Sequence, residues 1–314
     1  MCRPGSVELW VKRVWERVEN GEDQTTIIEL LEEAVATAGE GWDSSNLWSL
    51  YSMYMVNIDD IAGALSVHLR AVTVPSSGLQ EQVDCIEKFL VKHSPDQEAE
   101  VMQEVKKGLC ETQKEVEKRS EFESLLISNS KLSKDVAIYL KYVEYLKEKG
   151  SNNEVRLIYE RCLARCCREE ELWLKWVLWE QEQGDMDDVE SVLIRGQMCL
   201  PQSLPLHLIQ AEYKEEIGQF DEAHAILSKH ATNYPDPLSR ARLQIIHMEI
   251  RQGSSKEQVK ELFIEALRNS TDQKNASEII LKLSQYLQTK GSSTEAIEVL
   301  AQGILNNTKH KGSS

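Results

Sequence analysis

The sequence has few of the residues that break helices or cross-link loops. Only seven prolines occur in 314 residues, which favours a mainly helical chain. The seven cysteines form no C-x2-C pair and the N-terminus has no apolar leader, so we expect reduced thiols in the cytosol or nucleus. No run approaches 18 apolar residues, so we expect no membrane-spanning helix.

Positive charge is also scarce. The chain has 36 Lys and Arg residues against 52 Asp and Glu residues, which gives a formal net charge of −16. An acidic surface repels phosphate, so we expect no strong direct binding to nucleic acid. With 41% hydrophobic residues and 28% charged residues, the composition is that of a folded chain rather than a disordered one.

Catalytic motifs are missing. The sequence contains no P-loop, no H-E-x-x-H and no G-x-S-x-G, so we expect neither an enzyme nor a cofactor. Cys162, Cys166 and Cys167 lie close together on one expected helix, where a metal or redox site is one interpretation. Because no second cysteine pair or histidine accompanies them, we favour small buried apolar residues and expect no metal.

What the sequence does have is a repeated glycine. Gly150, Gly184, Gly218, Gly253 and Gly291 are separated by 34, 34, 35 and 38 residues. A large side chain precedes each glycine by five positions, and an apolar pair follows each by eight or nine. A period in the mid-thirties is typical of a helical-repeat solenoid, in which stacked hairpins present an extended surface to partners.

Each repeat is expected to be a helix–turn–helix hairpin, with the glycine in the left-handed position that ends the first helix. The sequence predicts an all-α fold, an α-solenoid of tetratricopeptide-like (TPR-like) hairpins in two arrays joined by a long helix. About two repeats occupy residues 1–75, a helical linker residues 76–132, about five repeats residues 133–306, and a disordered tail residues 307–314. In the linker, we expect the apolar residues at 122 and 125–127 to dock at the end of the long helix.

The repeat pattern resembles the HAT (half-a-TPR) family. Aromatic residues three apart in the first helix and an R-x3-E-R motif in the second are typical of these repeats, and here they are Tyr139, Tyr142 and Tyr145, then Arg156 to Arg161 in RLIYERCL. The stretches SVELW, EEAVATAG with LWSLY, YERCLARCCREEELWLKW and CLPQSLPLHLIQAEYKEEIGQFDEAHAIL are most similar to splicing factors of this family that associate with the U1 snRNP.

This resemblance implies a nuclear, non-enzymatic scaffold of pre-mRNA splicing. Such a protein contacts U1 snRNP proteins, supports 5′ splice site recognition through protein–protein contacts, and forms a homodimer through its C-terminal repeats. A HAT scaffold of another RNA-processing complex, in U4/U6 recycling or 3′-end cleavage, is one alternative. A TPR-type cochaperone adaptor is another, although the basic clamp of such adaptors is not evident at repeated positions.

Two surfaces are candidates for partner binding. Arg156, Arg161, Arg165 and Arg168 form the densest basic group and are a candidate docking patch, with ion pairing to nearby glutamates as the alternative. The last repeat has no following repeat to cover it. Its apolar residues are the candidate dimer surface: Ile279, Leu283, Leu287, Ile297, Leu300 and Ile304.

Three tryptophans invite a different hypothesis. Trp173, Trp176 and Trp179 lie three apart on one expected helix, and exposed rings could stack on bases. The preceding repeat has tyrosines at the same positions, and such periodicity favours core packing. We therefore expect the three rings to be buried.

Overall fold

The computed structural model describes residues 5–128, 136–184, 186–234, 240–270 and 273–311, with side chains described as far as residue 302. It confirms the all-α prediction, since 83% of the described residues are helical and they form 16 helices and no strand. The helices are α1 (Val7–Glu19), α2 (Gln24–Ala38), α3 (Ser45–Asn57), α4 (Ile61–Ala71), α5 (Leu79–His93), α6 (Glu98–Ser128), α7 (Val136–Lys149), α8 (Asn152–Cys166), α9 (Glu170–Gln183), α10 (Met186–Cys199), α11 (Leu204–Glu216), α12 (Phe220–Asn233), α13 (Arg240–Gln252), α14 (Lys256–Arg268), α15 (Gln273–Thr289) and α16 (Ser293–Lys311).

The helices form two compact units, Met1–Cys167 with α1 to α8 and Arg168–Ser314 with α9 to α16. This division lies at neither of the boundaries expected after residues 75 and 132. One reason is that α8 joins the N-terminal helices, because Asn153 donates a hydrogen bond of 2.9 Å to the carbonyl oxygen of Ala36. The repeat boundaries themselves stay a prediction.

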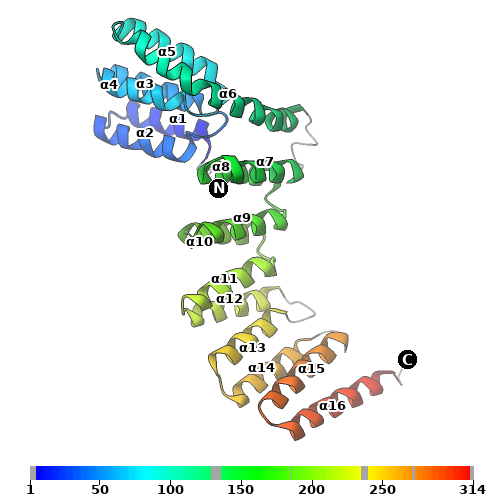
Figure 1. The fold of residues 1–314 in the computed structure, drawn as a ribbon. Helices are drawn as coiled ribbons and strands as arrows, with labels where there is room; N and C mark the ends of the chain where they lie inside the picture. Colours follow the sequence, from blue (N-terminus) through cyan, green and yellow to red (C-terminus); the bar gives the residue numbers. More distant parts are fainter. Residues whose placement is uncertain (1–4, 129–135, 185, 235–239, 271–272, 312–314) are drawn as a thin grey trace. The chain divides into compact units, whose positions relative to one another are not determined.

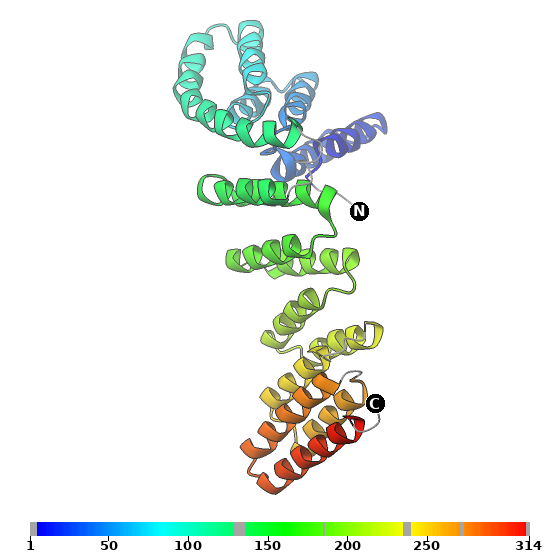
Figure 2. The ribbon, with the colours of Figure 1, turned by 90° about the vertical axis from the view of Figure 1, so that its right-hand side faces the viewer.

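Within each unit the helices pair as hairpins, and the hairpins stack (Figures 1 and 2). The first helix of one hairpin packs on its own partner and on the first helix of the next, as α1 does with α2 and α3, and α11 with α12 and α13. Trp173, Trp176 and Trp179 are 1%, 3% and 4% exposed, so the prediction that they belong to the core is confirmed. Base stacking on these rings is therefore ruled out in this conformation.

The turns between paired helices follow the glycine period with one exception. Gly184, Gly218, Gly253 and Gly291 have φ values of 76° to 84°, the left-handed region that glycine adopts without a steric penalty. The expected left-handed cap at Gly150 is wrong. This glycine is needed for a close approach instead, since a Cβ atom there would lie 2.6 Å from Glu154 Oε2 and 3.0 Å from the Leu146 carbonyl oxygen.

The same turn recurs in the N-terminal repeats, where the glycine period was not recognised. Gly21 and Asp59 both have left-handed φ values, of 73° and 65°. They lie eleven residues after Trp10 and Trp48, as Gly184 lies eleven residues after Trp173. Aspartate is one of the few residues besides glycine that tolerates this conformation, so the turn is preserved although the glycine is not.

The predicted long helix is α6, with 31 residues, and it contacts α5 and α7 within the N-terminal unit. Its N-terminal half buries Met102 and Val105 on the core of the N-terminal hairpins. Of the apolar residues expected to dock at its end, Leu126 is buried but Leu125 and Ile127 are exposed, which corrects that expectation. Residues on one face of an α-helix recur every three or four positions, so only one of the three consecutive residues 125–127 can face the core.

Candidate interaction site

The end of α6 lies against α7 through aromatic rings. Phe122 stacks on Tyr142 with a centroid distance of 4.7 Å and an interplanar angle of 3°. It also lies 5.6 Å from Tyr145, whose hydroxyl donates a hydrogen bond of 2.6 Å to Glu115. Burial comes first among the causes that raise the Tyr145 pKa to about 12, followed by this hydrogen bond to the Glu115 carboxylate. These contacts fix α6 on the first helix of the next hairpin.

An ion pair joins α6 to α8. Arg161 donates two hydrogen bonds, of 2.6 and 2.7 Å, to the two carboxylate oxygens of Glu123. The Glu123 side chain is 3% exposed and that of Arg161 35%. Burial opposes the charge of Arg161, but the hydrogen bonds from its guanidinium to Glu123 and the negative charges of Glu123 and Asp43 outweigh it and raise its pKa. Arg161 therefore stays charged and holds the bidentate geometry.

A second buried pair, between Arg119 of α6 and Glu154 of α8, lies beside the first. Glu154 also completes a capping box with Ser151. Its carboxylate accepts a hydrogen bond of 2.9 Å from the Ser151 backbone N–H, and the Ser151 hydroxyl oxygen accepts one of 3.1 Å from the Glu154 backbone N–H. The missing Cβ of Gly150 makes room for this carboxylate. Arg119 is 5% exposed, and its Nε–H has no hydrogen-bond partner among the described residues.

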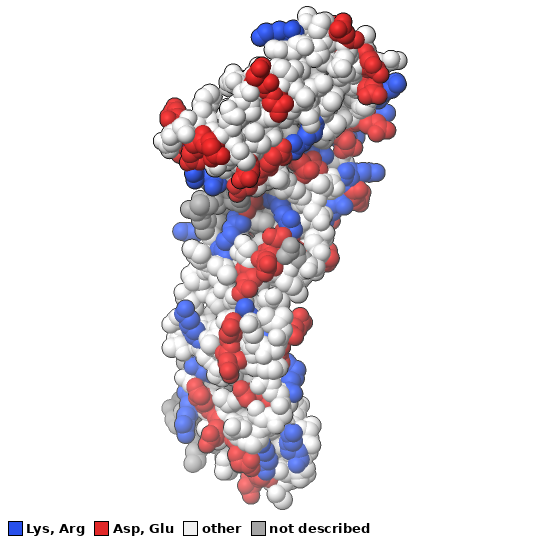
Figure 3. Space-filling view, turned by 90° about the vertical axis from the view of Figure 1, so that its left-hand side faces the viewer, with Lys and Arg blue, Asp and Glu red and all other residues white. Residues whose placement is uncertain are grey.

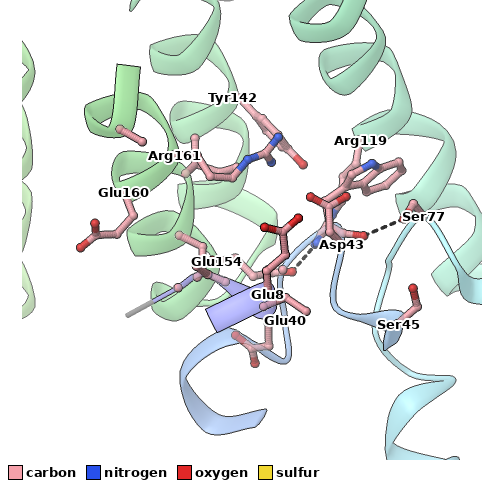
Figure 4. A pocket seen from close by; sticks show the side chains of 18 of the residues that line it. Glu8, Glu40, Asp43, Ser45, Ser77, Arg119, Tyr142, Glu154, Glu160 and Arg161 are labelled. Atoms are coloured by element: carbon pink, nitrogen blue, oxygen red, sulfur yellow. Dashed lines mark hydrogen bonds and ion pairs between the residues drawn. The ribbon is translucent and has the colours of Figure 1, made fainter. Parts of the chain in front are cut away.

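These two arginines line a cavity of about 490 Å³ within the N-terminal unit. The other walls are the start of α1, the loop between α2 and α3, Ser77, and the inner faces of α7 and α8. In Figure 4 the side chains of Glu8, Asp43, Arg119 and Arg161 point toward one another, whereas Glu160 points away. Tyr142, Leu146 and Leu157 form a buried apolar part of the lining.

The loop that carries Asp43 is held in place by hydrogen bonds. The backbone N–H and the hydroxyl of Ser77 both donate to the carbonyl oxygen of Trp42, at 2.9 and 3.0 Å. The buried Trp48 indole donates to the carbonyl oxygen of Gly39 at 2.8 Å. Because both ends of this loop are tied to the hairpin core, the position of Asp43 at the cavity is defined by the fold.

The four arginines of the candidate docking patch have different surroundings. Arg161 forms an ion pair with Glu123, Arg156 is half-buried, and Arg165 and Arg168 are exposed. Arg168 belongs to the C-terminal unit and the other three to the N-terminal unit. On the face in Figure 3, blue and red side chains are interspersed and the described residues show no extended basic area. Arg165 thus remains the most accessible member of the patch within the N-terminal unit.

The candidate dimer residues are divided between core and surface. Ile279, Leu283 and Leu287 of α15 are at most 2% exposed and pack with Phe263 inside the C-terminal unit, so these three do not form an open surface. On α16, Ile297 is 64% exposed and Leu300 is half-buried. Ile304 lies outside the residues whose side chains are described.

Sequence reasoning missed Arg119 and Glu123, because α6 was expected to be exposed and rich in solvated charge. A weak signal was present. Arg119, Glu123 and Leu126 follow one another at spacings of four and three, the spacing of one helix face, and all three are at most 5% exposed. Phe122 on the same side of the helix marks that face as the one that packs.

No cofactor or metal site emerges from the described part of the chain. Cys162 and Cys166 are buried, as expected for small apolar residues. No group of three or more His, Cys, Asp or Glu side chains within the described residues could hold a metal ion. None of the described helices is both long enough and apolar enough to cross a bilayer.

Comparison with known proteins identifies the repeats. Residues 117–251 match the family model described as PRP39 C-terminal HAT repeat. The chain is 22% identical over 357 residues to pre-mRNA-processing factor 39 of Xenopus laevis, covering 95% of this chain and 55% of that protein. It is 25% identical over 146 residues to the Homo sapiens protein of the same name, covering 46% of this chain and 22% of the relative. The chain thus spans about half the length of the Xenopus relative.

A solved structure with the same architecture is that of CSTF-77. The TM-score is 0.62 and the match covers 97% of this chain and 67% of that one. At 14% sequence identity this likeness supports the solenoid fold alone. The family match and the curated relatives, which agree with the repeat pattern of the sequence, lead to one conclusion: this chain is similar to pre-mRNA-processing factor 39, and its residues 117–251 match the C-terminal HAT repeat described for PRP39.

Proposed function

We propose that this chain is a nuclear, non-enzymatic scaffold of pre-mRNA splicing that associates with the U1 snRNP. In this role it supports 5′ splice site recognition through contacts with proteins rather than with bases. The observation that carries the proposal is the match of residues 117–251 to the PRP39 C-terminal HAT repeat, together with relatives that all bear the name pre-mRNA-processing factor 39. A stacked-hairpin architecture and an excess of negative charge are both suited to protein partners.

Affinity purification from nuclear extract tests the proposal. The tagged chain should enrich U1 snRNA and U1 proteins over a tag-only control, and recovery of another small nuclear RNA in place of U1 would refute the assignment. Treatment with RNase before elution separates the two routes of association, since contacts through proteins survive digestion of accessible RNA. Enrichment lost completely on such treatment would contradict the protein-contact mechanism.

Arg165 is proposed as a docking residue of this scaffold, because it is an exposed cation in an acidic protein. Arg165→Glu should reduce recovery of U1 proteins without lowering the melting temperature. Lys12→Glu is the matched control, since Lys12 is also on the N-terminal unit and its side chain is 72% exposed. Equal recovery with both variants would remove Arg165 from the docking surface.

The proposed scaffold is also a homodimer through its last repeat. Ile297 is the exposed apolar residue that supports this, at 64% exposure on α16. Ile297→Asp should shift the mass measured by light scattering from dimer to monomer. Leu281→Asp is a control on the neighbouring helix, where Leu281 is 50% exposed. A monomer mass of the unmodified chain at all concentrations would refute dimerisation.

A further inference from the structure

A small cavity of the C-terminal unit is not explained by the stacking of its hairpins. It lies between α12, α13 and α14 and has a volume of about 100 Å³. That is a few times the roughly 30 Å³ that one water occupies in the liquid, and well below the roughly 300–1,000 Å³ of a small-molecule site. The cavity is therefore of a size to take one side-chain group of a partner rather than a free ligand.

The cavity lies where other repeats place an aromatic ring. Four repeats have a buried aromatic residue eleven positions before the residue of the turn: Trp10, Trp48, Tyr139 and Trp173. In the repeat of α13 and α14 this position is Arg242, eleven residues before Gly253, and Arg242 lines the cavity. The ring that fills the position in those four repeats is therefore missing here.

The neighbours of this position show that Arg242 follows the path of the missing ring. The Trp173 ring lies against Gly196, twelve residues after its turn glycine, where a Cβ atom would approach the ring to 3.2 Å. The residue twelve positions after Gly253 is Glu265, and its carboxylate lies 3.9 Å from Arg242 Nε. A guanidinium group fills less space than an indole ring, which accounts for the cavity beside it.

The guanidinium group of Arg242 is open to a further contact. The side chain is 18% exposed, and the distance of 3.9 Å to Glu265 is too long for a hydrogen bond. Arg242 donates no hydrogen bond to any described residue, and none of its nitrogen atoms is shut off from solvent, so the buried part is the aliphatic stem. Arg242 and Glu265 both line the cavity, so the charged ends of this pair lie at its wall.

The rest of the lining is part apolar and part polar. Ala231 and Ile245 are buried and Leu262 is half-buried, and these three supply apolar contacts. Ser228 and Thr232, four residues apart on α12, supply hydroxyl groups. Such a lining suits a group that is itself apolar with one polar end.

The N-terminal unit shows how a ring, a guanidinium group and a glutamate combine in this protein. The hydroxyl of Tyr51 donates a hydrogen bond of 2.6 Å to Glu32, which also accepts two from Arg70, of 2.6 and 2.9 Å. The Arg70 guanidinium lies 5.2 Å from the centre of the Trp48 ring. Arg242 and Glu265 supply the cation and the carboxylate of such a group, and a phenol ring would complete it.

Charge disfavours an anion as the occupant. A carboxylate or phosphate would meet Glu265 beside Arg242, in a chain whose net charge is −16. A neutral phenol avoids this repulsion, gains a cation–π contact with the guanidinium and can donate its hydroxyl to Glu265.

We propose that the cavity binds a tyrosine side chain of a partner polypeptide, with the ring against Arg242 and Ile245 and the hydroxyl donating to Glu265. The residues whose side chains are not described include no phenylalanine, tryptophan or tyrosine, so none of them supplies the ring. This proposal does not depend on the splicing role.

The test uses the methyl group of Ile245 as a local reporter. The full chain is labelled with ¹³C at the isoleucine δ1 methyl groups, and Ile245→Val identifies the resonance of interest. The probe is the capped peptide acetyl-Gly-Gly-Tyr-Gly-Gly-amide, and control peptides carry phenylalanine, leucine or glutamate in place of tyrosine. The tyrosine peptide should shift the Ile245 resonance saturably through its ring current, which the leucine peptide lacks. The phenylalanine peptide should bind about threefold more weakly because it has no hydroxyl.

Variants at Arg242 separate the cation from the empty ring position. Arg242→Met keeps the stem and should weaken binding of the tyrosine peptide by about threefold. The matched control is Arg268→Met, which removes the same charge from an exposed position of α14 outside the cavity and should bind as the unmodified chain does. Arg242→Trp restores the ring of the other repeats, so it should abolish the shift of Ile245 without lowering the melting temperature.

Several results would overturn the proposal. Equal binding of the leucine peptide would remove the ring from the argument, and tighter binding of the glutamate peptide would assign the cavity to a carboxylate. Equal weakening by Arg268→Met would reduce the effect to net charge. A large fall in the melting temperature of Arg242→Trp would show that no ring position is open. Light scattering is recorded in parallel, since conversion of a dimer to a monomer by the tyrosine peptide would replace the partner by a second copy of this chain.

Discussion

Loss of the Arg161–Glu123 pair should destabilise the N-terminal unit strongly. Arg161→Met leaves the Glu123 carboxylate, 3% exposed, without the two hydrogen bonds of 2.6 and 2.7 Å. Removing one partner of a buried pair costs about 3–5 kcal/mol. The Arg161 side chain is 35% exposed, so water screens part of the interaction and we expect the lower end, about 3 kcal/mol.

A double-mutant cycle measures the pair itself. The free energy of unfolding is obtained by urea denaturation followed by circular dichroism for Arg161→Met, Glu123→Gln and the double variant. Because the neutral glutamine no longer needs a cation, the double variant should cost less than the sum of the single ones, with a coupling energy of about 1–3 kcal/mol. Hydrogen exchange of the α6 amides should rise in Arg161→Met. Additive costs, or a loss below about 0.5 kcal/mol, would refute the assignment of this pair as the link between α6 and α8.

Three further predictions concern the core, the turns and pH. Trp179→Ala should cost about 3–5 kcal/mol through the cavity left in the core and lower the melting temperature, whereas an unchanged melt would contradict its burial. Gly253→Ala should cost about 1–2 kcal/mol in urea unfolding because φ is 80°, while Gly108→Ala inside α6, where a Cβ meets nothing within 4 Å, should stabilise by about 0.5–1 kcal/mol. Hydrogen bonds from Lys256 and Lys260 of α14 lower the pKa of Glu295 to about 2. The ionised Glu295 therefore stabilises the folded state fully above about pH 4.5, and this contribution is lost as the pH falls toward 2. Thermal melts of Glu295→Gln and the unmodified chain should therefore converge over that range, and a constant difference would contradict the ion pairs.

Periodic features of the fold could be predicted from the sequence because they repeat. Most hairpins repeat a left-handed turn and large buried side chains at equivalent positions, so the pattern of one repeat predicts the next. The tryptophans at 173, 176 and 179 are an example, since tyrosines occupy equivalent positions one repeat earlier. The left-handed turns were recognised only where they are glycine, and Asp59 shows that the backbone conformation is preserved more strictly than the residue type.

The candidate site could not be predicted because it arises where the period breaks. Arg119 and Glu123 lie in a helix with no equivalent elsewhere in the sequence, and their partners are 35 and 38 residues further along. A charged residue in a polar helix is ordinarily solvated, so burial of these two depends on how α6 packs, which composition does not reveal. Three of the six candidate dimer residues, on α15, are buried for a related reason: apolar spacing shows that a helix has a buried face but not whether a helix of the same unit covers that face.

The longer-range ion pairs span about one repeat in sequence. Glu32 and Arg70 lie 38 residues apart, Glu215 and Arg251 lie 36 apart, and Lys256 and Glu295 lie 39 apart. Each pair ties a hairpin to the next hairpin of its own unit, and several are at least partly exposed. Exposed pairs weaken with added salt while apolar contacts do not. The elastic stiffness of each unit is therefore expected to fall as the ionic strength of its surroundings rises, so that salt sets how easily each stack of hairpins bends.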